Sequence, residues 1–281
     1  ESNILAANEV QLKIISSAYG RFSGLELVGV VSQAGELAQA WLGKVVVVPA
    51  ILPCGECKFC QMGQVVACSS VEVDSHETFL ERTIVPQRFL LDLQAPPFPL
   101  IDKDKIWQYA ALSDCLSLPY AGLVQAGYGA GDLCVVIGGG YQAAATLCMA
   151  HALGGQVMVL EQNAEERERL QAAPFLAKFA FEPHWNLQKD LHRCLEMAEA
   201  RSMRLVVIDT TFSLMGKMLS LSLLSSGGTA VWLGTPQSET ISSGNAQKFS
   251  ELIASQPHLD LMLASVCKAQ ATIVGVPFAH P

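Results

Sequence analysis

The chain has 281 residues, enough for one large domain or two of ordinary size; 51% of them are hydrophobic and 16% are charged. The formal net charge of −8, without a stripe of Lys and Arg, argues against a nucleic-acid partner. Apolar runs such as VVVVPAIL (45–52) have the length of a strand, which argues against a membrane-spanning segment.

Residues 1 to about 105 read as β-strands separated by turns. The strand-like runs are rich in β-branched residues, and the Pro-rich segment QAPPFPLID (94–102) follows them. We therefore predict a mostly β domain over residues 1–105. Its predicted strands are 8–17, 25–35, 44–50 and 81–86.

Four of the nine cysteines lie within PCGECKFCQMGQVVAC (53–68). No secretory leader is apparent before this segment, and the other five cysteines lie in apolar runs, which favours a reducing, cytoplasmic location. Closely spaced thiolates on a turning loop can converge on one zinc ion at about 2.3 Å, and four of them leave no open coordination position. The segment thus predicts a structural zinc lobe, with unligated buried thiols or a redox C-x-x-C as alternatives. The predicted ligands are Cys54, Cys57, Cys60 and Cys68.

From about residue 130 the pattern changes to strands alternating with helices. The strands are almost continuously apolar, as expected when both faces of a parallel sheet are covered. Amphipathic segments such as 164–173 lie between them. The pattern predicts an α/β fold, a Rossmann-type doubly wound parallel sheet, over residues 106–281. Its predicted strands are 133–138, 156–160, 205–210, 229–234 and 271–276.

A dinucleotide fingerprint follows the first of these strands. Gly138, Gly140 and Ala143 occupy the fixed places of G-x-G-x-x-[GA], and the next strand ends in Glu161. The first glycine permits a tight turn, the second lets the pyrophosphate approach the backbone, and the helix N-terminus attracts its charge. Glu161 can bind the ribose hydroxyls and would repel a 2′-phosphate; Gln162 and Asn163 bring no cation, so NAD is favoured over NADP. A Gly-rich turn without a ligand is the alternative.

Several passages resemble the zinc-type alcohol dehydrogenase group of the medium-chain dehydrogenase/reductase superfamily. They are the four-cysteine segment, PYAGLVQAGYGAGDLCVVIGGG (119–140), IDTTF (208–212) and LLSSGGTAVWLG (223–234). The resemblance implies a GroES-like fold for the first domain and a homodimer, or a dimer with a homologous subunit, through residues 271–278. It also implies a segment that returns to the first domain after the nucleotide domain; the sequence ends at Pro281, before that segment, so either the protein is shortened or further residues are omitted.

Within the group, two passages are similar to the 6-hydroxycyclohex-1-ene-1-carbonyl-CoA dehydrogenases. These are SDCLSLPYAGLVQAGYGAGDLCVVIG (113–138) and LDLMLASVCKAQATIVG (259–275). This closer similarity implies an acyl-CoA as the small-molecule substrate.

The group also implies a second, catalytic zinc, held by a Cys, by a His from a G-H-E segment and by a third Cys, Asp or Glu. Here Gly24-Leu25-Glu26 stands at the G-H-E place, no cysteine lies near residues 16–20, and Asp114 is the remaining candidate. Leucine cannot bind zinc, and two carboxylates make a poor zinc site. We therefore predict that the catalytic zinc is absent.

Two functions are consistent with this pattern. The first is an NAD-dependent oxidoreductase without catalytic zinc, acting on a hydroxy, oxo or enoyl substrate. Hydroxyl donors such as Ser17 and Tyr19, with Asp114 and Glu26, would take the place of the metal. The second is a non-catalytic NAD-binding or structural subunit beside an active homologue. The ribose-binding carboxylate favours the first.

Overall fold

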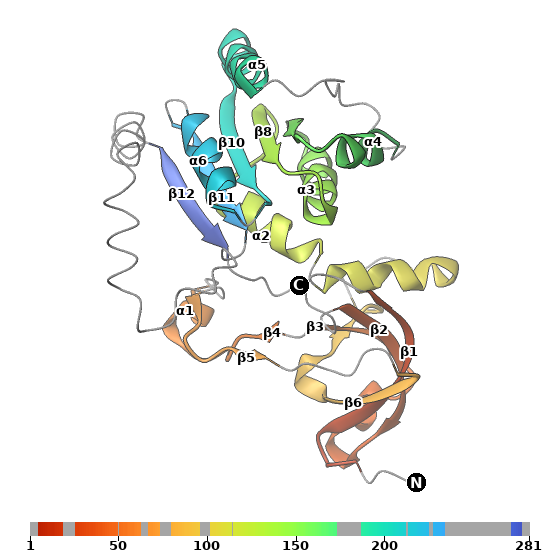
Figure 1. The fold of residues 1–281 in the computed structure, drawn as a ribbon. Helices are drawn as coiled ribbons and strands as arrows, with labels where there is room; N and C mark the ends of the chain where they lie inside the picture. The colour runs from red at the N-terminus through yellow and green to blue at the C-terminus, as the bar shows by residue number, and fades with distance from the viewer. Residues whose placement is uncertain are drawn as a thin grey trace, which may run out of the picture. The chain divides into compact units, whose positions relative to one another are not determined.

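A computed structural model of the chain describes most of its residues, and these divide into two compact units. The units are Glu1–Leu118 with Phe278–Pro281, and Pro119–Pro277 (Figure 1). Each unit is built around its own sheet, so each is described separately. The described residues are 5–18, 26–49, 51–62, 67–73, 80–95, 102–113, 115–172, 187–211, 213–224, 227–233 and 271–276.

The first unit contains an antiparallel sheet with the strand order β6-β1-β2-β3-β7. The four strands predicted in this half are confirmed as β1, β2, β3 and β6. The elements are β1 (Glu9–Ala18), β2 (Glu26–Ala34), β3 (Val45–Pro49), β6 (Arg82–Pro86) and β7 (Leu91–Asp92), with 3-10 helices η1 (Glu36–Trp41), η3 (Gln87–Phe89) and η4 (Lys103–Leu112).

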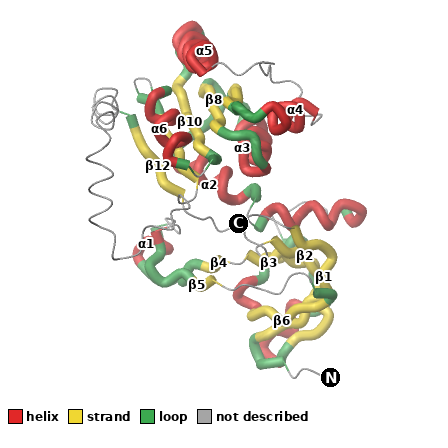
Figure 2. The backbone as a smooth tube through the Cα atoms, in the orientation of Figure 1, coloured by secondary structure: helices red, strands yellow, loops and turns green. Residues whose placement is uncertain are grey.

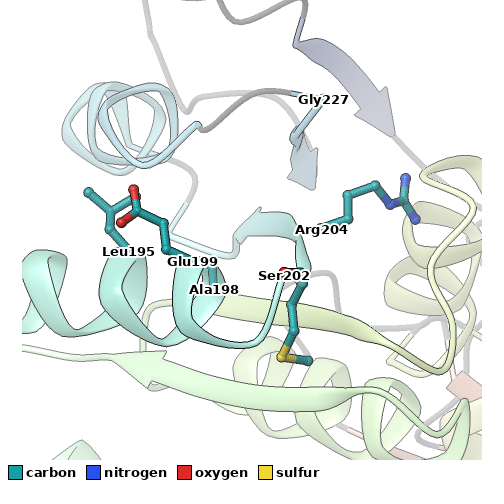
Figure 3. A pocket seen from close by; sticks show the side chains of 7 residues that line it. Leu195, Ala198, Glu199, Ser202, Arg204 and Gly227 are labelled. Atoms are coloured by element: carbon teal, nitrogen blue, oxygen red, sulfur yellow. The ribbon is translucent and has the colours of Figure 1, made fainter.

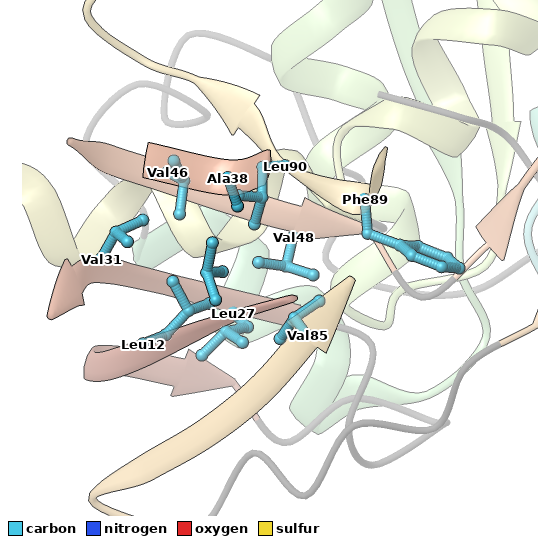
Figure 4. Close-up of a cluster of buried hydrophobic side chains, with 10 residues drawn as sticks. Leu12, Leu27, Val31, Ala38, Val46, Val48, Val85, Phe89 and Leu90 are labelled. Atoms are coloured by element: carbon cyan, nitrogen blue, oxygen red, sulfur yellow. The ribbon is translucent and has the colours of Figure 1, made fainter. Parts of the chain in front are cut away.

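Both faces of this sheet are buried, because successive side chains of a strand point to opposite faces. Leu27 and Val46 pack into one apolar cluster, together with Leu12, Val85 and Phe89 (Figure 4). Val28 and Val47, one residue further along their strands, pack with Leu93 and Ala110 on the other side. Ala110 lies on η4, which contacts β1 and β2. The helix η4 covers the second face, and this explains why β3 is an unbroken apolar run.

The second unit contains a parallel sheet with the order β12-β11-β10-β8-β9. Strands and helices alternate along it, as Figure 2 shows, so the predicted α/β class and all five predicted strands are confirmed. The elements are α2 (Ser117–Gln125), β8 (Asp132–Ile137), α3 (Tyr141–Ala152), β9 (Gln156–Leu160), α4 (Ala164–Ala172), α5 (Leu187–Ala200), β10 (Arg204–Asp209), α6 (Leu214–Ser222), β11 (Thr229–Leu233) and β12 (Thr272–Val276).

Helices cover both faces of the parallel sheet. Val135 and Val207 pack with Cys194 of α5 on one face. Their neighbours on the opposite face, such as Val136 and Ile208, are also fully buried. The chain passes from β8 to β9 and then back to β10 on the other side of β8, which creates the topological switch point where such sheets bind nucleotides.

The ends of the described sheet bear on two further expectations. Among the described residues β12 pairs with β11 alone, so it is an edge strand, and the dimer through this strand stays a prediction. In the part of the chain that the structure describes, no helix is long and apolar enough to cross a membrane.

Arg204 links the first residues of two neighbouring parallel strands, β10 and β8. Its guanidinium donates to both carboxylate oxygens of Asp132, at 3.1 and 2.7 Å, and to the carbonyls of Ala126 and Gly127. Through its hydrogen bonds, Asp132 raises the pKa of Arg204. The side chain thereby joins β10 to β8 and to the end of α2.

We expect Arg204→Met to lower the free energy of unfolding by about 2 kcal/mol, because it removes charge-assisted hydrogen bonds and leaves a largely buried Asp132 without its cation. Arg169→Met is the matched control: its exposed ion pair with Glu166 should contribute about 0.5 kcal/mol or less. Urea denaturation measures both variants, and equal losses would contradict the role given to Arg204.

Candidate dinucleotide site and metal centre

The turn after β8 requires glycine at its first position. Gly138 has φ +113°, and a Cβ on it would lie 2.6 Å from Oγ1 of Thr210. That hydroxyl donates to the carbonyl of Ile137 at 2.8 Å, and the Gly138 N–H donates to the carbonyl of Leu160 at 2.9 Å. The turn is therefore clamped between the ends of β9 and β10, as a tight phosphate-binding turn requires.

Glu161 lies beside this turn. A Cβ on Gly139 would come within 2.6 Å of its Oε2, and its Oε1 accepts from the backbone N–H of Asn163 at 2.6 Å. Gly140 is the N-cap of α3, and a Cβ there would meet no atom of the described residues within 4 Å. The structure thus brings Gly138, Gly140 and Glu161 to one edge of the sheet, with open space at the helix N-terminus.

Ala143, the last fingerprint residue, lies in the first turn of α3 and is fully buried. A small residue there lets the helix pack closely on the sheet. The backbone N–H groups of the first turn have no partners within the helix and can bind an anion. This geometry fits the pyrophosphate of a dinucleotide, with the Glu161 carboxylate placed for a ribose.

A cation that the sequence analysis missed also lies near Glu161. Arg167, on α4, donates from Nη1 to the backbone carbonyls of Glu161 and Gln162, at 2.8 and 2.7 Å. The expectation that this end of the site brings no cation rested on Gln162 and Asn163 alone. Helix α4 brings Arg167 back to the end of β9. The available signal in the sequence was an arginine five residues after Gln162 and six residues after Glu161.

A buried ion pair lies behind the turn on the β10 side, also missed from sequence. Nζ of Lys217 is 3.2 Å from Oδ2 of Asp209, which is fully buried, and lies over the ring of Trp232. The hydroxyl of Thr211 donates to Oδ1 of Asp209 at 2.6 Å. Gly216 permits this packing, since a Cβ there would clash with Thr211 and Asp209. The network fixes the segment that contacts Gly138.

The four predicted metal ligands lie together in the first unit. Their Sγ atoms are all within 4.8 Å of one another, and among the described residues they form the one group of three or more potential ligands with this spacing. Separate Sγ–Sγ distances are 3.5 Å for Cys57–Cys60, 3.6 Å for Cys54–Cys68 and 3.9 Å for Cys54–Cys60. A tetrahedron with Zn–S bonds of about 2.3 Å has edges of about 3.8 Å, so the thiols fit zinc.

The local backbone explains how the thiols converge. Gly55 has φ +76°, which turns the chain between the first two cysteines. The short helix α1 (Lys58–Gln61) carries Cys60, and the small antiparallel sheet of β4 (Ile51–Leu52) and β5 (Glu72–Val73) brings the two ends of the lobe together. The lobe is therefore closed by its cysteines and by four strand residues; of the side chains that the structure describes there, Cys68 alone is buried.

The thiols differ in acidity. Hydrogen bonds from the backbone N–H groups of Cys57 and then Glu56 lower the pKa of Cys54 to about 7. Loss of hydration raises the pKa of Cys60 to about 12, and a hydrogen bond with Cys57 adds to this rise. Crowded thiols cannot all ionise by themselves, whereas a bound zinc ion deprotonates the thiols that coordinate it. The donor set therefore suits a divalent soft cation.

The predicted catalytic residues lie mainly outside the described residues. Ser17 is half-buried near the end of β1, opposite Leu27 on β2. Glu26 begins β2 and pairs with Ala18 and Pro49, but its side chain lies outside the described part of the structure. Tyr19, Leu25 and Asp114 also lie outside the described residues. The catalytic assignment stays a prediction.

A pocket of about 440 Å³ lies at the amino ends of the parallel strands, where β10 begins. Figure 3 shows it between the end of α5, with Ala198 and Glu199, and Gly227 before β11. Ligands of open α/β sheets bind at the carboxyl ends of the strands, and Gly138 lies at the carboxyl end of β8. This pocket is therefore separate from the candidate dinucleotide site.

Comparisons with known proteins agree with both halves of the fold. Residues 5–95 match the alcohol dehydrogenase GroES-like domain. Over 149 residues, 52% of this chain, the sequence is 30% identical to 2-dehydro-3-deoxy-L-galactonate 5-dehydrogenase of Pseudoalteromonas atlantica. That match spans 41% of the relative, which is less than half its length.

Solved structures resemble the chain over nearly its full length. Galactitol-1-phosphate dehydrogenase of Escherichia coli has a TM-score of 0.72 and 15% identity over 99% of this chain and 78% of its own. A Sinorhizobium meliloti protein, solved with NADP bound, has a TM-score of 0.65 and 18% identity over 99% of this chain and 79% of its own. At these identities the likeness establishes the fold: a GroES-like domain and a Rossmann domain.

Proposed function

We propose that the chain belongs with the zinc-type alcohol dehydrogenases of the medium-chain dehydrogenase/reductase superfamily and is an oxidoreductase using a nicotinamide dinucleotide. The observation that carries the proposal is the placement of Glu161. Its carboxylate is held by the Asn163 N–H beside Gly139, within the turn that opens α3. A turn without a ligand has less physical need for a carboxylate so placed.

In this proposal each feature of the site has a separate task. The N–H groups at the start of α3 bind the pyrophosphate, Gly140 leaves room for it, and Glu161 accepts hydrogen bonds from the adenosine ribose. The bound nicotinamide supplies or accepts the hydride. The Asp209–Lys217 pair keeps the Thr210–Thr211 segment in place against Gly138. The chain therefore orients the dinucleotide through rigid elements of the second unit.

We propose NAD rather than NADP as the dinucleotide, because a 2′-phosphate would meet the Glu161 carboxylate. Arg167 does not reverse this preference, since its guanidinium already donates to two backbone carbonyls. Both contacts use Nη1 and hold the guanidinium against the backbone at the end of β9. The Arg167 side chain therefore stabilises the backbone at the ribose end of the site, and Glu161 recognises the ribose.

We assign the four-cysteine lobe to a structural zinc and propose that the hydride transfer proceeds without a second zinc. Leu25 stands at the place of the expected histidine ligand, which supports this proposal. Hydroxyl donors such as Ser17 and Tyr19 would then polarise the substrate oxygen. The proposed substrates are small hydroxy or oxo compounds, with enoyl compounds and acyl-CoA thioesters included. We place the protein in the cytoplasm as a dimer through β12.

The proposal is tested by measuring NADH and NADPH affinity for the wild type and for Glu161→Ala. The wild type should bind NADH more tightly, and the variant should lose about tenfold or more in NADH affinity, because each ribose hydrogen bond to a carboxylate contributes about 1.5–3 kcal/mol. NADPH affinity should stay constant or rise. Fluorescence titration of the nucleotide gives the dissociation constants.

The matched control is Glu165→Ala, which removes the same charge from an exposed position in the first turn of α4. It should change NADH affinity by less than about twofold, since exposed charges at this distance are screened by salt. No binding of either nucleotide by the wild type would contradict the proposal. Equal losses in both variants would contradict the role of Glu161.

Leu25, at the place of the expected histidine ligand, also supports a second candidate function. Leu25, together with the lack of a cysteine near residues 16–20, is also what a non-catalytic subunit paired with an active homologue would have. Such a subunit should bind NADH normally but reduce no ketone, enone or acyl-CoA on its own. Turnover of any of these substrates by the purified chain, with NADH consumed in proportion, would exclude it.

A further inference from the structure

Gln142 is a buried polar side chain beside the candidate dinucleotide site. It is 3% exposed, and its Oε1 has no hydrogen-bond partner among the described residues. It is the second helical residue of α3, directly after Gly140 and Tyr141. A buried carbonyl oxygen without a donor costs about 1–3 kcal/mol, and native proteins rarely keep one without a reason.

Three hydroxyls of α3 and of the segment after β10 do not donate to this oxygen, because each donates elsewhere. The Thr146 hydroxyl, one turn along α3, donates to the backbone carbonyl of Gln142 at 2.7 Å and not to its side chain. The Thr210 hydroxyl donates to Ile137, and the Thr211 hydroxyl donates to Asp209. A donor for Oε1 must therefore come from a bound molecule or from outside these groups.

A nicotinamide dinucleotide has three kinds of donor, the adenine amino group, the ribose hydroxyls and the carboxamide NH2, and the first of these belongs to the adenosine half. The pyrophosphate at Gly140 only accepts hydrogen bonds. The adenosine half extends toward Glu161 at the end of β9, so its ribose hydroxyls already have an acceptor. Thr210 and Thr211 at the end of β10 line the other side of the turn, and the nicotinamide half would extend toward them.

We propose that Oε1 of Gln142 accepts a hydrogen bond from the carboxamide NH2 of the bound nicotinamide; this inference rests on the proposed function. A ribose hydroxyl can rotate toward a phosphate or toward water. The carboxamide NH2 is conjugated with the ring and needs an acceptor at a fixed place once water is excluded. Gln142 is thereby a positioning residue that fixes the rotation of the carboxamide and, with it, the ring.

The experiment measures binding without turnover, by calorimetry, with three ligands and one variant. NAD+ carries the carboxamide, 3-acetylpyridine adenine dinucleotide replaces its NH2 by a methyl group, and ADP-ribose lacks the whole ring but keeps the second ribose. The variant is Gln142→Met, which keeps an unbranched chain of similar length and removes the polar oxygen.

We expect the wild type to bind NAD+ about tenfold more tightly than the acetylpyridine analogue. Gln142→Met should lose that tenfold for NAD+ alone and should bind the analogue and ADP-ribose as the wild type does. Its unfolding temperature should be equal or higher, because the buried oxygen is gone. If the variant fails to fold, the wild-type preference for NAD+ over the analogue still tests the inference.

Three outcomes would overturn the inference. The first is unchanged NAD+ binding by Gln142→Met. The second is an equal loss for ADP-ribose, which would assign Oε1 to a ribose hydroxyl. The third is a wild type that binds NAD+ and the analogue equally. If the wild type binds ADP-ribose, any of these three results overturns the inference but leaves the dinucleotide site in place. If the wild type binds neither ADP-ribose nor NAD+, the proposed function itself is refuted.

Discussion

Replacing Cys60 with Ser should reduce the zinc content of the purified protein from one ion per chain to less than about a tenth, because the site needs all four thiolates to close a tetrahedron. Among its described residues, the lobe has few other contacts to hold it. Its two strands have two residues each, and α1 has four residues, none of them fully buried. We therefore expect metal coordination to be the main source of its folding free energy.

The loss of metal should be accompanied by local unfolding of the lobe. Limited proteolysis should cut within residues 51–73 of Cys60→Ser, while the parallel sheet, which contains none of these cysteines, keeps its resistance. A chelator added to the wild type should produce the same cleavage. Elemental analysis and mass spectrometry of the fragments measure the two effects.

Cys148→Ser is the matched control for this experiment. It removes a thiol from α3, where burial raises the pKa of Cys148, and it lies outside the metal cluster. The control should keep one zinc per chain and an uncut lobe. Two zinc ions in the wild type would mean that the catalytic ligands are misassigned, and a zinc content unchanged in Cys60→Ser would refute the four-thiolate site.

Gly140→Ala should abolish most dinucleotide binding and leave the fold intact. Gly140 has φ −70° and ψ −172°, which alanine adopts without strain, and its Cβ would have open space among the described residues. In the proposed function the pyrophosphate occupies that space, so the added methyl should weaken NADH binding by on the order of a hundredfold. The free energy of unfolding should change by less than about 0.5 kcal/mol.

Two other glycines make this prediction specific. Gly129→Ala also adds a Cβ into open space, but in the connection before β8, and should affect neither binding nor stability. Gly138→Ala combines φ +113° with a contact on Thr210, so it should lower stability by about 1 kcal/mol or more as well as binding. Wild-type NADH affinity in Gly140→Ala would refute the assigned position of the pyrophosphate.

Features that depend on neighbours in the chain were predictable from the sequence. Alternating and continuous apolar runs predicted the strands, since the period of side chains along a strand is local. The spacing of Cys54 to Cys68 predicted a cluster, because a short turning loop leaves the thiols little freedom to separate. The glycine fingerprint predicted the turn at Gly138 for the same reason. The 3-10 helix η4 was not predicted, although its N-cap Asp102, which accepts from the Asp104 N–H, was a local signal.

Only the tertiary structure decided which side chains from different strands meet. The parallel sheet brings the ends of β8, β9 and β10 to one edge, and this alone places Glu161 beside Gly139 and Thr210 against Gly138. The same packing buries Lys217 with Asp209 and leaves Oε1 of Gln142 without a donor. A sequence specifies residue types and local periods, whereas desolvation and pairing depend on long-range contacts that no local pattern encodes.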